Sequence, residues 1–404
     1  MKKLLFGIIV ILFSCQHKPE TKAQIIEELK SIDAKPLELV ANGKLKVLHL
    51  TGTPYERGFQ HGKLLKEEIK TVTDSLLIDI GKTTNEEPTV FIKRFLKETD
   101  FVSPMKKWTP DLLEEIKGIS DGSGISYDII FMHQLGDEFF FNTKYLFAHK
   151  CSSVGIRKSS KHPTITAQNM DIPTYFHGHQ TVLNFTDNEG NEVMVLTIPG
   201  HTGITGMNNS SVSINCNILM QMNSQSTGLP VSAIVRGVLD KKNYQEAFNW
   251  INEVEHASGQ NYLIGGSNQV ISLECSANLI KDFKPFKDAS FTYHTNHPLS
   301  NTDYSEWYLE ALKENGFTLI DSKDFCQRLP SLKKRFNEDN SEFGINEIKE
   351  VLSSKDHDGY DVLSNTYTYA SVIYVLAESP KFIIAPGKPH ETEYLEIKFN
   401  DKVH

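Results

Sequence analysis

Cys151 is the residue whose type and surroundings best suit nucleophilic chemistry. It lies in the sequence HKCSSVGI, and the later sequence QNMD ends at Asp171. Small and β-branched residues at 153–156 and 164–169 predict two strands, and the His-Pro pair between them predicts a turn. This hairpin would bring Asp171 back beside Cys151. Since a cysteine in a strand is most often a small buried hydrophobic residue, other parts of the chain must support the chemistry.

Five cysteines are present, at positions 15, 151, 216, 275 and 326. If Cys15 is lipidated and Cys151 is a free nucleophile, three cysteines remain, and an odd number in an exported chain is not a disulfide framework. At most one bridge could form among Cys216, Cys275 and Cys326. The sequence contains no CxxC pair and no zinc-ligand spacing, so it predicts no metal and no cofactor.

The N-terminus predicts a secretory signal. Lys2 and Lys3 precede an uncharged run at 4–13, which is too short for the roughly 20 residues of a membrane-spanning helix. Residues 12–15 (LFSC) resemble a bacterial lipobox, in which the cysteine, here Cys15, is lipidated. A plain signal peptide is the alternative.

The chain is therefore divided into four expected parts. These are a signal peptide and lipobox at 1–15, a tether and leading segment at 16–45, a helical segment at 46–150, and the nucleophile-bearing chain at 151–404. The expected location is the bacterial cell envelope, periplasmic or surface-facing, with a lipid anchor in the membrane. A net charge of -9 argues against a nucleic-acid partner, which would require a basic face.

The elements before Cys151 are predicted to be mainly helical. Thr53, Pro54 and Glu56 form a capping-box pattern at the start of a helix. Gly58 and Gly62 lie on adjacent turns and would permit close approach of another backbone. The apolar positions of this helix recur at steps of three and four: Phe59, Gly62, Leu65, Ile69, Val72, Leu76 and Ile80.

Two more helices are expected, from 109–110 to about 121–124 and from 129 to about 141. The second contains Asp137 and Glu138. Adjacent helical residues point about 100 degrees apart, so these two carboxylates are not expected to act as a glycosidase pair.

After Asp171 the chain becomes rich in strands, and helices return toward its end. This order favours an α+β layered domain. The predicted strands are 181–184, 193–198, 212–218, 261–264, 270–273, 291–295, 369–376 and 382–385. The predicted helices are 232–239, 244–253, 304–315, 322–329 and 345–353.

Six segments, spread over about residues 46 to 390, match the motifs of a known family in order. They are 52–62 (GTPYERGFQHG), 115–124, 151–153 with 169–171, 206–208 with 215–217, 294–297 (HTNH) and 356–357. Together they resemble the acyl-coenzyme A:6-aminopenicillanate acyltransferase family of N-terminal-nucleophile hydrolases. The resemblance implies a four-layer αββα sandwich and a precursor that cuts itself before its nucleophile.

The resemblance also implies roles for single residues. Cleavage between Lys150 and Cys151 would create an α-amino group with an unperturbed pKa of about 7.7–8.0, suitable as a base for the thiol. Asp171 would orient and charge-balance that amine. Asn296 would donate to the oxyanion, helped by the backbone around Asn217.

Two positions depart from the family pattern. The family usually has glycine before the nucleophile, where this chain has Lys150. Relatives that hydrolyse bile-acid conjugates carry an arginine near the hairpin aspartate, where this chain has Gln168, and segment 366–371 contains no arginine. A bile acid or another strongly anionic substrate is therefore not expected.

The histidines of the sequence allow two other interpretations. A papain-like protease could pair Cys151 with His294 or His297, but its cysteine begins a helix rather than a strand. His177 and His179 could hold a metal with His201, although no further ligand has a suitable spacing.

The sequence at 356–361 resembles a calcium loop but lacks the closing glutamate, since residue 367 is tyrosine. We interpret this segment as a turn.

The sequence therefore predicts an exported thiol-dependent amide hydrolase or acyltransferase that acts on carbon–nitrogen bonds other than ordinary peptide bonds. Its expected partners are a small N-acyl amide, or an acyl donor plus an amine. The alternative from another class is a non-catalytic surface lipoprotein that uses the same fold to bind a ligand.

Overall fold

The computed structural model describes residues 36–144, 150–187, 190–322, 325–337, 343–359 and 361–399. All of them belong to one compact unit, Pro36–His404. The predicted signal peptide, Cys15 and most of the predicted tether lie outside the described residues. Among the residues described, no helix is long and apolar enough to cross a bilayer.

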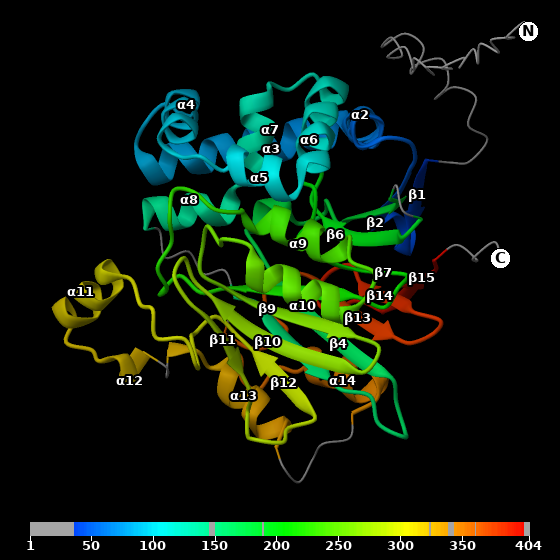
Figure 1. Cartoon of the computed structure of the whole chain (residues 1–404), viewed down its shortest axis with the longest axis vertical. Helices are drawn as coiled ribbons and strands as arrows, with labels where there is room; N and C mark the ends of the chain where they lie inside the picture. The colour runs from blue at the N-terminus through cyan, green and yellow to red at the C-terminus, as the bar shows by residue number, and fades with distance from the viewer. Residues whose placement is uncertain are drawn as a thin grey trace, which may run out of the picture. The chain divides into compact units, whose positions relative to one another are not determined.

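Two sheets form the centre of this unit (Figure 1). The first has nine strands in the order β1 (Leu37–Val40), β2 (Leu45–Leu50), β5 (Thr181–Thr186), β6 (Glu192–Thr197), β7 (Thr205–Asn208), β8 (Ser213–Ile218), β9 (Gln260–Gly266), β10 (Gln269–Cys275) and β11 (Ile280–Phe283). The second has six, in the order β12 (Phe291–His294), β3 (Ser152–Ile156), β4 (Thr164–Asp171), β13 (Thr368–Leu376), β14 (Lys381–Ala385) and β15 (Leu395–Ile397).

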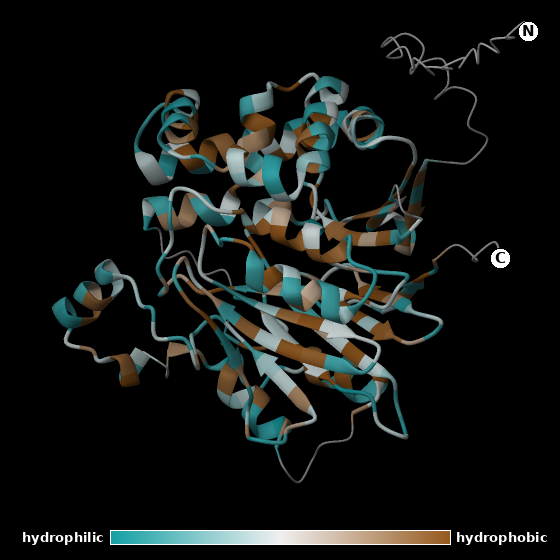
Figure 2. Ribbon diagram, viewed as in Figure 1, coloured by the Kyte–Doolittle hydropathy of each residue, from teal (hydrophilic) through white to brown (hydrophobic). Residues whose placement is uncertain are grey.

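The sheets pack face to face, with β3 and β4 against β8 and β9. The outer face of the nine-stranded sheet is covered by α9 (Val231–Leu239) and α10 (Tyr244–Glu253). The six-stranded sheet packs on α13 (Arg328–Arg335) and α14 (Ile345–Leu352). Figure 2 shows that the strands of both sheets are rich in hydrophobic residues. This arrangement confirms the predicted α+β, four-layer αββα fold.

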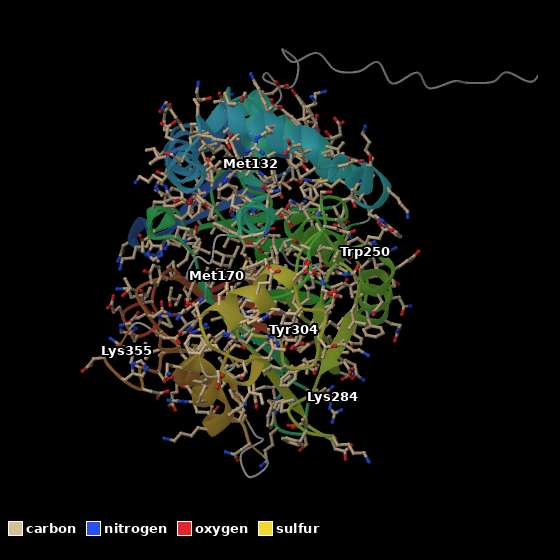
Figure 3. All side chains as sticks on the ribbon, turned by 90° about the vertical axis from the view of Figure 1, so that its left-hand side faces the viewer. Met132, Met170, Trp250, Lys284, Tyr304 and Lys355 are labelled. Atoms are coloured by element: carbon tan, nitrogen blue, oxygen red, sulfur yellow. The ribbon has the colours of Figure 1, made fainter. Side chains whose placement is uncertain are left out.

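A group of helices from the segment before Cys151 packs beside the nine-stranded sheet (Figure 1). Its members are α2 (Pro54–Leu64), α3 (Lys66–Thr84), α4 (Pro88–Glu98), α5 (Val102–Trp108), α6 (Pro110–Ser123), α7 (Tyr127–His133) and α8 (Gly136–Thr143). In Figure 3, Met132 of α7 marks this helical layer, and Met170 of β4 lies below it in the view.

The two predicted glycines of α2 lie directly against α6. A Cβ atom on Gly58 would lie 1.9 Å from the carbonyl oxygen of Glu115, and one on Gly62 would lie 2.4 Å from that of Ile119. Both distances are far below a van der Waals contact, so only glycine allows these backbones to approach so closely. The predicted close approach is confirmed, as is the capping box of Thr53 and Glu56.

The structure corrects the predicted boundaries of several helices. The apolar face from 59 to 80 belongs to two helices, because Leu65 leaves the helical conformation with φ -113° and ψ 28° while its side chain stays buried. The helix predicted at 129–141 is likewise two. Between them the side chain of Gln134 donates to the backbone of Gly200, a tertiary contact that sequence periodicity does not reveal.

The prediction of a helix at 322–329 is wrong. In its place are α12 (Leu319–Ser322) and α13, which begins at Arg328. The helix predicted at 304–315 is α11 (Glu306–Glu314). The short strands β1, β11 and β15 and the helices α4 and α5 were not predicted.

Candidate active site

Cys151 immediately precedes β3, which pairs antiparallel with β4 as the sequence predicted. Ser152 lies opposite Asn169, so Cys151 comes next to Met170, and their sulfur atoms are 3.4 Å apart. The backbone amide of Asp171 donates to the Cys151 thiol. The hairpin therefore brings Cys151 and Asp171 together.

Asp171 ends β4 in a buried position with two hydrogen-bond donors. The Asn365 Nδ2 group donates to one carboxylate oxygen at 2.6 Å, and the Thr368 hydroxyl donates to the other at 2.8 Å. Burial raises the pKa of Asp171 to about 7, although Arg328 and these donors oppose that effect. The carboxyl group thus lacks a full counter-charge, which a nearby ammonium group would supply.

Asn296 lies against the backbone of the candidate nucleophile. Its side-chain oxygen accepts the backbone N–H of Cys151 at 2.8 Å, and its Nδ2 group donates to the carbonyl of Ile218 at 3.0 Å. Gln221 donates to the backbone carbonyl of Asn296 at 3.0 Å. Asn296 therefore bridges the strands that carry Cys151 and Ile218.

A buried hydrogen bond between a histidine and a glutamate organises the loop that carries Asn296. Glu274 and His294 are fully buried and their side chains meet at 2.7 Å. Glu274 also accepts the backbone N–H groups of Leu299, Ser300 and Asn301. Burial opposes its ionisation, but His294 and these donors outweigh burial and lower the pKa of Glu274.

Asn217 lies on β8, facing the hairpin rather than the Cys151 sulfur. Its side-chain oxygen accepts from Ser153 at 2.6 Å and from Asn261 at 2.9 Å. The carbonyl of the preceding residue, Cys216, accepts from Gln168. A role for the backbone around Asn217 in an oxyanion hole stays a prediction.

Arg328 is a site residue that the sequence reasoning missed. Its Nη1 group donates to the carbonyl of Cys151 at 2.6 Å and to the Ser152 hydroxyl at 2.9 Å. Its Nη2 group donates to Asn296 at 3.1 Å, and its Nε group pairs with Asp361 at 2.9 Å. The only sequence clue is an arginine directly before an apolar residue, Leu329, at the start of a helix.

The pKa values of the two thiols close to Arg328 are shifted in opposite directions. Burial, and then the charge of Asp171, raises the pKa of Cys151 to about 12. Burial also disfavours a Cys326 thiolate, but Arg328 and His297 outweigh it and lower the pKa of Cys326 to about 6. In the uncut chain Cys151 is therefore a protonated thiol at neutral pH.

Disulfide bonds are absent from the part of the chain that the structure describes. Its four cysteines, Cys151, Cys216, Cys275 and Cys326, are all free and buried. The single bridge that the sequence left open does not form.

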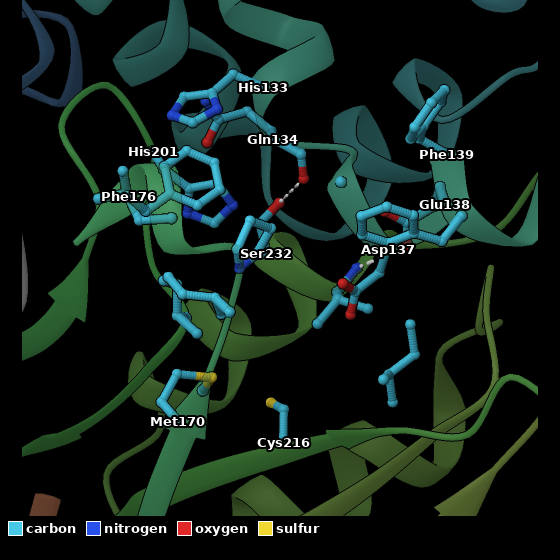
Figure 4. Close-up of a pocket in the computed structure, with 18 of the residues that line it drawn as sticks. His133, Gln134, Asp137, Glu138, Phe139, Met170, Phe176, His201, Cys216 and Ser232 are labelled. Atoms are coloured by element: carbon cyan, nitrogen blue, oxygen red, sulfur yellow. Dashed lines mark hydrogen bonds between the residues drawn. The ribbon is translucent and has the colours of Figure 1, made fainter. Parts of the chain in front are cut away.

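A cavity of about 130 Å³ opens beside Cys151. One wall is apolar and aromatic, with Met170, Phe176 and His201, and the opposite wall carries Asp137 and Glu138 (Figure 4). Substrate atoms in this cavity would lie next to the candidate nucleophile.

The histidines of the rejected alternatives have other partners. His294 pairs with Glu274, and His297 hydrogen-bonds to Cys326. His177 contacts the carbonyl of Tyr367 at 3.2 Å. Since Cys151 precedes a strand and neither candidate histidine is its partner, the papain-like arrangement is excluded.

Asp356 from the late motif forms a surface ion pair with Arg335 at 2.7 Å. It takes no part in the group of residues around Cys151.

Comparisons with known proteins bear on the family to which this chain belongs. The family model for acyl-coenzyme A:6-aminopenicillanic acid acyl-transferase matches residues 157–371, which is more than half of the chain. The 40 kDa form of this acyltransferase from Emericella nidulans is 27% identical over 274 residues, covering 67% of this chain and 74% of the relative. Protein dcd1A from Dictyostelium discoideum is 33% identical over 131 residues, covering 29% of this chain and 28% of the relative.

Two solved structures are also similar. A mutant of conjugated bile acid hydrolase from Clostridium perfringens has a TM-score of 0.38 and 12% identity, covering 62% of this chain and all of that one. Penicillin V acylase from Agrobacterium tumefaciens has a TM-score of 0.37 and 11% identity, covering 61% and 86%. On the family match, this chain belongs to the acyl-coenzyme A:6-aminopenicillanic acid acyl-transferase family.

Proposed function

We propose that this protein is a thiol-dependent amide hydrolase or acyltransferase that acts on non-peptide carbon–nitrogen bonds through a thioacyl intermediate on Cys151. Family membership supports the general class of acyl-transferring enzyme. The Cys151 nucleophile, cleavage at Lys150-Cys151, and export with a lipid anchor on Cys15 belong to the proposal. The proposed substrates are a small acyl donor plus an amine, which the acyltransferase of Emericella nidulans favours by similarity, or a small N-acyl amide.

The observation that carries the proposal is the way in which the backbone of Cys151 is held. Asn296 accepts its N–H at 2.8 Å, and Arg328 donates to its carbonyl at 2.6 Å. These contacts fix the nitrogen that cleavage would release as an amine. An amine at that position would be close to its own thiol and to the buried Asp171 carboxyl group.

Self-cleavage requires the thiol to attack the preceding peptide bond. The Cys151 sulfur would add to the carbonyl carbon of Lys150, the carbon–nitrogen bond would break, and the thiol proton would pass to the departing amine. Water would then hydrolyse the thioester and leave a carboxylate on Lys150. The Lys150 ammonium group contacts Asp361 at 3.0 Å, which supports a fixed position for the bond to be cut.

Turnover would repeat this chemistry on a substrate. The neutral α-amine takes the thiol proton, the sulfur attacks the acyl carbon, and the leaving amine receives the proton. Water or a second amine then attacks the thioester. Asp171 would balance the transient ammonium group, and a side-chain donor such as the Asn296 amide stabilises an oxyanion by on the order of 3 kcal/mol.

Intact-mass measurement and N-terminal sequencing test the proposal. We expect wild-type protein to yield a second chain beginning at Cys151 and a Cys151→Ala variant to stay uncut. Cys216→Ala is the matched control, because Cys216 is another buried free thiol lining the same cavity, and we expect it to be cut. A wild-type chain that stays uncut and whose Cys151 resists alkylation would favour the non-catalytic binding lipoprotein.

A further inference from the structure

The cavity beside Cys151 is acidic as well as apolar. Its lining includes the carboxyl groups of Asp79, Asp137, Glu138 and Asp171, and none of the lining residues within the described ranges is lysine or arginine. Of the two histidines in the lining, His133 has a pKa that burial lowers to about 4, and burial lowers that of His201 as well. Burial raises the pKa of Asp137 to about 6, and burial and the charge of Asp137 raise that of Glu138 to about 8. At pH 8 Asp137 is therefore ionised and Glu138 is ionised in part, and no lysine or arginine of the described lining offsets this charge.

Two of these carboxyl groups have other partners: Asp171 faces the α-amine that cleavage would create, and Asp79 lies near the charge of Lys82. Asp171 accepts from Asn365 and Thr368, and Asp79 is hydrogen-bonded by the Tyr175 hydroxyl. These contacts assign Asp171 and Asp79 to other parts of the site than the proposed ligand contact.

The hydrogen bonding of Asp137 and of its neighbours Glu138 and Gln260 is less complete. The side chain of Asp137 accepts a hydrogen bond from Gln260 Nε2 at 2.8 Å. Gln260 is fully buried and its Oε1 atom has no hydrogen-bond partner within the described structure. Glu138 is 4% exposed, and although its Oε1 atom accepts from Val231 and Ser258, its Oε2 atom likewise has no partner there.

This wall of the cavity thus presents three side chains with oxygen acceptors and a shortage of donors. Leaving a buried acceptor without a donor costs about 1–3 kcal/mol, and more for a charged group. A primary ammonium group carries three N–H donors, no acceptor and the missing positive charge. Its chemistry complements Asp137, Glu138 and Gln260 in all three respects.

We propose that the ligand of this cavity carries a primary ammonium group that binds to Asp137, with Gln260 and Glu138 accepting its remaining N–H donors. The apolar part of the same ligand lies against the opposite wall, which includes Met170 and Phe176 (Figure 4). This inference rests on the proposed function for its substrate class, an amide that joins an apolar part to a part bearing an ammonium group. Neutral ligands of the same shape bind more weakly.

Calorimetric titration with hexylammonium and with 1-hexanol, at about pH 8, tests this proposal. The two probes share an alkyl chain and differ in the group that would meet Asp137. We expect hexylammonium to bind wild-type protein at least ~10-fold more tightly, a preference that matches one charge-assisted contact. Hexylammonium that binds no better than 1-hexanol, or does not bind, overturns the proposal without reference to any variant.

Two variants assign the preference to a residue. Asp137→Asn keeps the shape of the side chain but removes its charge, and we expect it to abolish most of the preference. Asp79→Asn is the matched control, because it removes a carboxyl group of the same cavity that Tyr175 hydrogen-bonds and that lies near the charge of Lys82. An equal loss in both variants would overturn the assignment to Asp137.

The same titrations on a Cys151→Ala chain separate this proposal from the enzyme proposal. Binding of hexylammonium requires no thiol, no cleavage and no acyl transfer. A retained preference in a chain without Cys151 supports the ammonium site even if the nucleophile has been assigned wrongly. Loss of the preference in that chain contradicts a site built on Asp137.

Discussion

Carboxyl groups are buried in two regions of the molecule, and their pKa values are shifted in opposite directions. Between the helical layer and the nine-stranded sheet, Glu115 meets Arg236 through two hydrogen bonds of 2.7 and 2.8 Å. Burial disfavours its charge, but Arg236 outweighs burial and lowers the pKa of Glu115. Beside Cys151, burial raises the pKa of Asp137 to about 6 and that of Asp171 to about 7.

The comparison distinguishes a carboxylate that stabilises the fold from carboxyl groups that can bind a cation of the ligand or of the cleaved chain. Glu115 has a bidentate arginine, which is the geometry that best stabilises a buried carboxylate. Asp137 has one amide donor and faces open space in the cavity. A buried carboxyl group with a raised pKa marks a functional site more often than a structural one.

The largest expected effect on stability comes from breaking the structural pair. Replacing Arg236 with methionine removes the bidentate partner of buried Glu115 and leaves it the charge of Arg57, and we expect a loss of about 3–5 kcal/mol in the free energy of unfolding. Urea titration followed by circular dichroism measures it. An Arg236→Met, Glu115→Leu double variant should recover much of the loss, and a loss below about 1 kcal/mol in the single variant would show that the pair is not structural.

The pH dependence of stability sharpens the comparison, because ionisation of Asp137 and ionisation of Glu115 change the free energy of unfolding in opposite directions. The folded-state pKa of Asp137 is raised from 3.8 to about 6, so the folded chain binds more protons than the unfolded chain between those values. Ionisation of Asp137 therefore reduces stability as pH rises from about 4 to 6. We expect Asp137→Asn to gain up to about 3 kcal/mol relative to wild type across that window.

Glu115 provides the reference for that measurement. Its lowered pKa means that its contribution is present above its unfolded value of about 4.5 and is lost as pH falls. Glu115→Gln should therefore be most destabilising near neutral pH. Unfolding titrations of both variants from about pH 4 to 7 would contradict the comparison if the two differences from wild type changed with pH in the same direction.

The smallest effect is expected at the exposed start of α2. Thr53 and Glu56 hydrogen-bond to each other's backbone N–H groups, so Thr53→Ala should cost about 1 kcal/mol. This change belongs to the structural region alone and should leave cleavage before Cys151 unaltered. Thermal unfolding and intact mass are the two readouts, and loss of cleavage in a folded variant would show that the regions are not separate.

Much of the fold could be predicted from local patterns. Alternating and β-branched residues indicated the hairpin of 153–156 and 164–169, and paired glycines indicated the contact of α2 with α6. The break at Leu65 could not be predicted, because the apolar periodicity continues across it and tertiary packing decides the backbone conformation. Short edge strands such as β11 carry too few residues for a clear pattern.

The candidate site was predictable only where residues are close in the chain or belong to a motif. The hairpin brought Asp171 to Cys151, and the HTNH motif indicated Asn296. Arg328 comes from a helix 177 residues away in sequence, and its partners, among them the Cys151 carbonyl and Asp361, lie in separate segments that leave no pattern. Asp137 was dismissed because it does not converge with Glu138 as a glycosidase pair. Its position in the cavity depends on the separate helix α8, which the sequence did not reveal.

The central claim, that acyl groups are carried on Cys151, can be tested by trapping the intermediate. Purified protein is mixed with p-nitrophenyl hexanoate, quenched in acid and digested, and the peptides are analysed by mass spectrometry. Digestion with pepsin keeps the sample acidic, so that the acyl group does not move from the thiol to the α-amine of Cys151. We predict a hexanoyl thioester, labile to hydroxylamine, on the peptide that contains Cys151, and its persistence in a Cys326→Ala variant. Since Arg328 and His297 lower the pKa of Cys326 to about 6, that thiol is the competing nucleophile. An adduct on Cys326 with none on Cys151 would contradict the account.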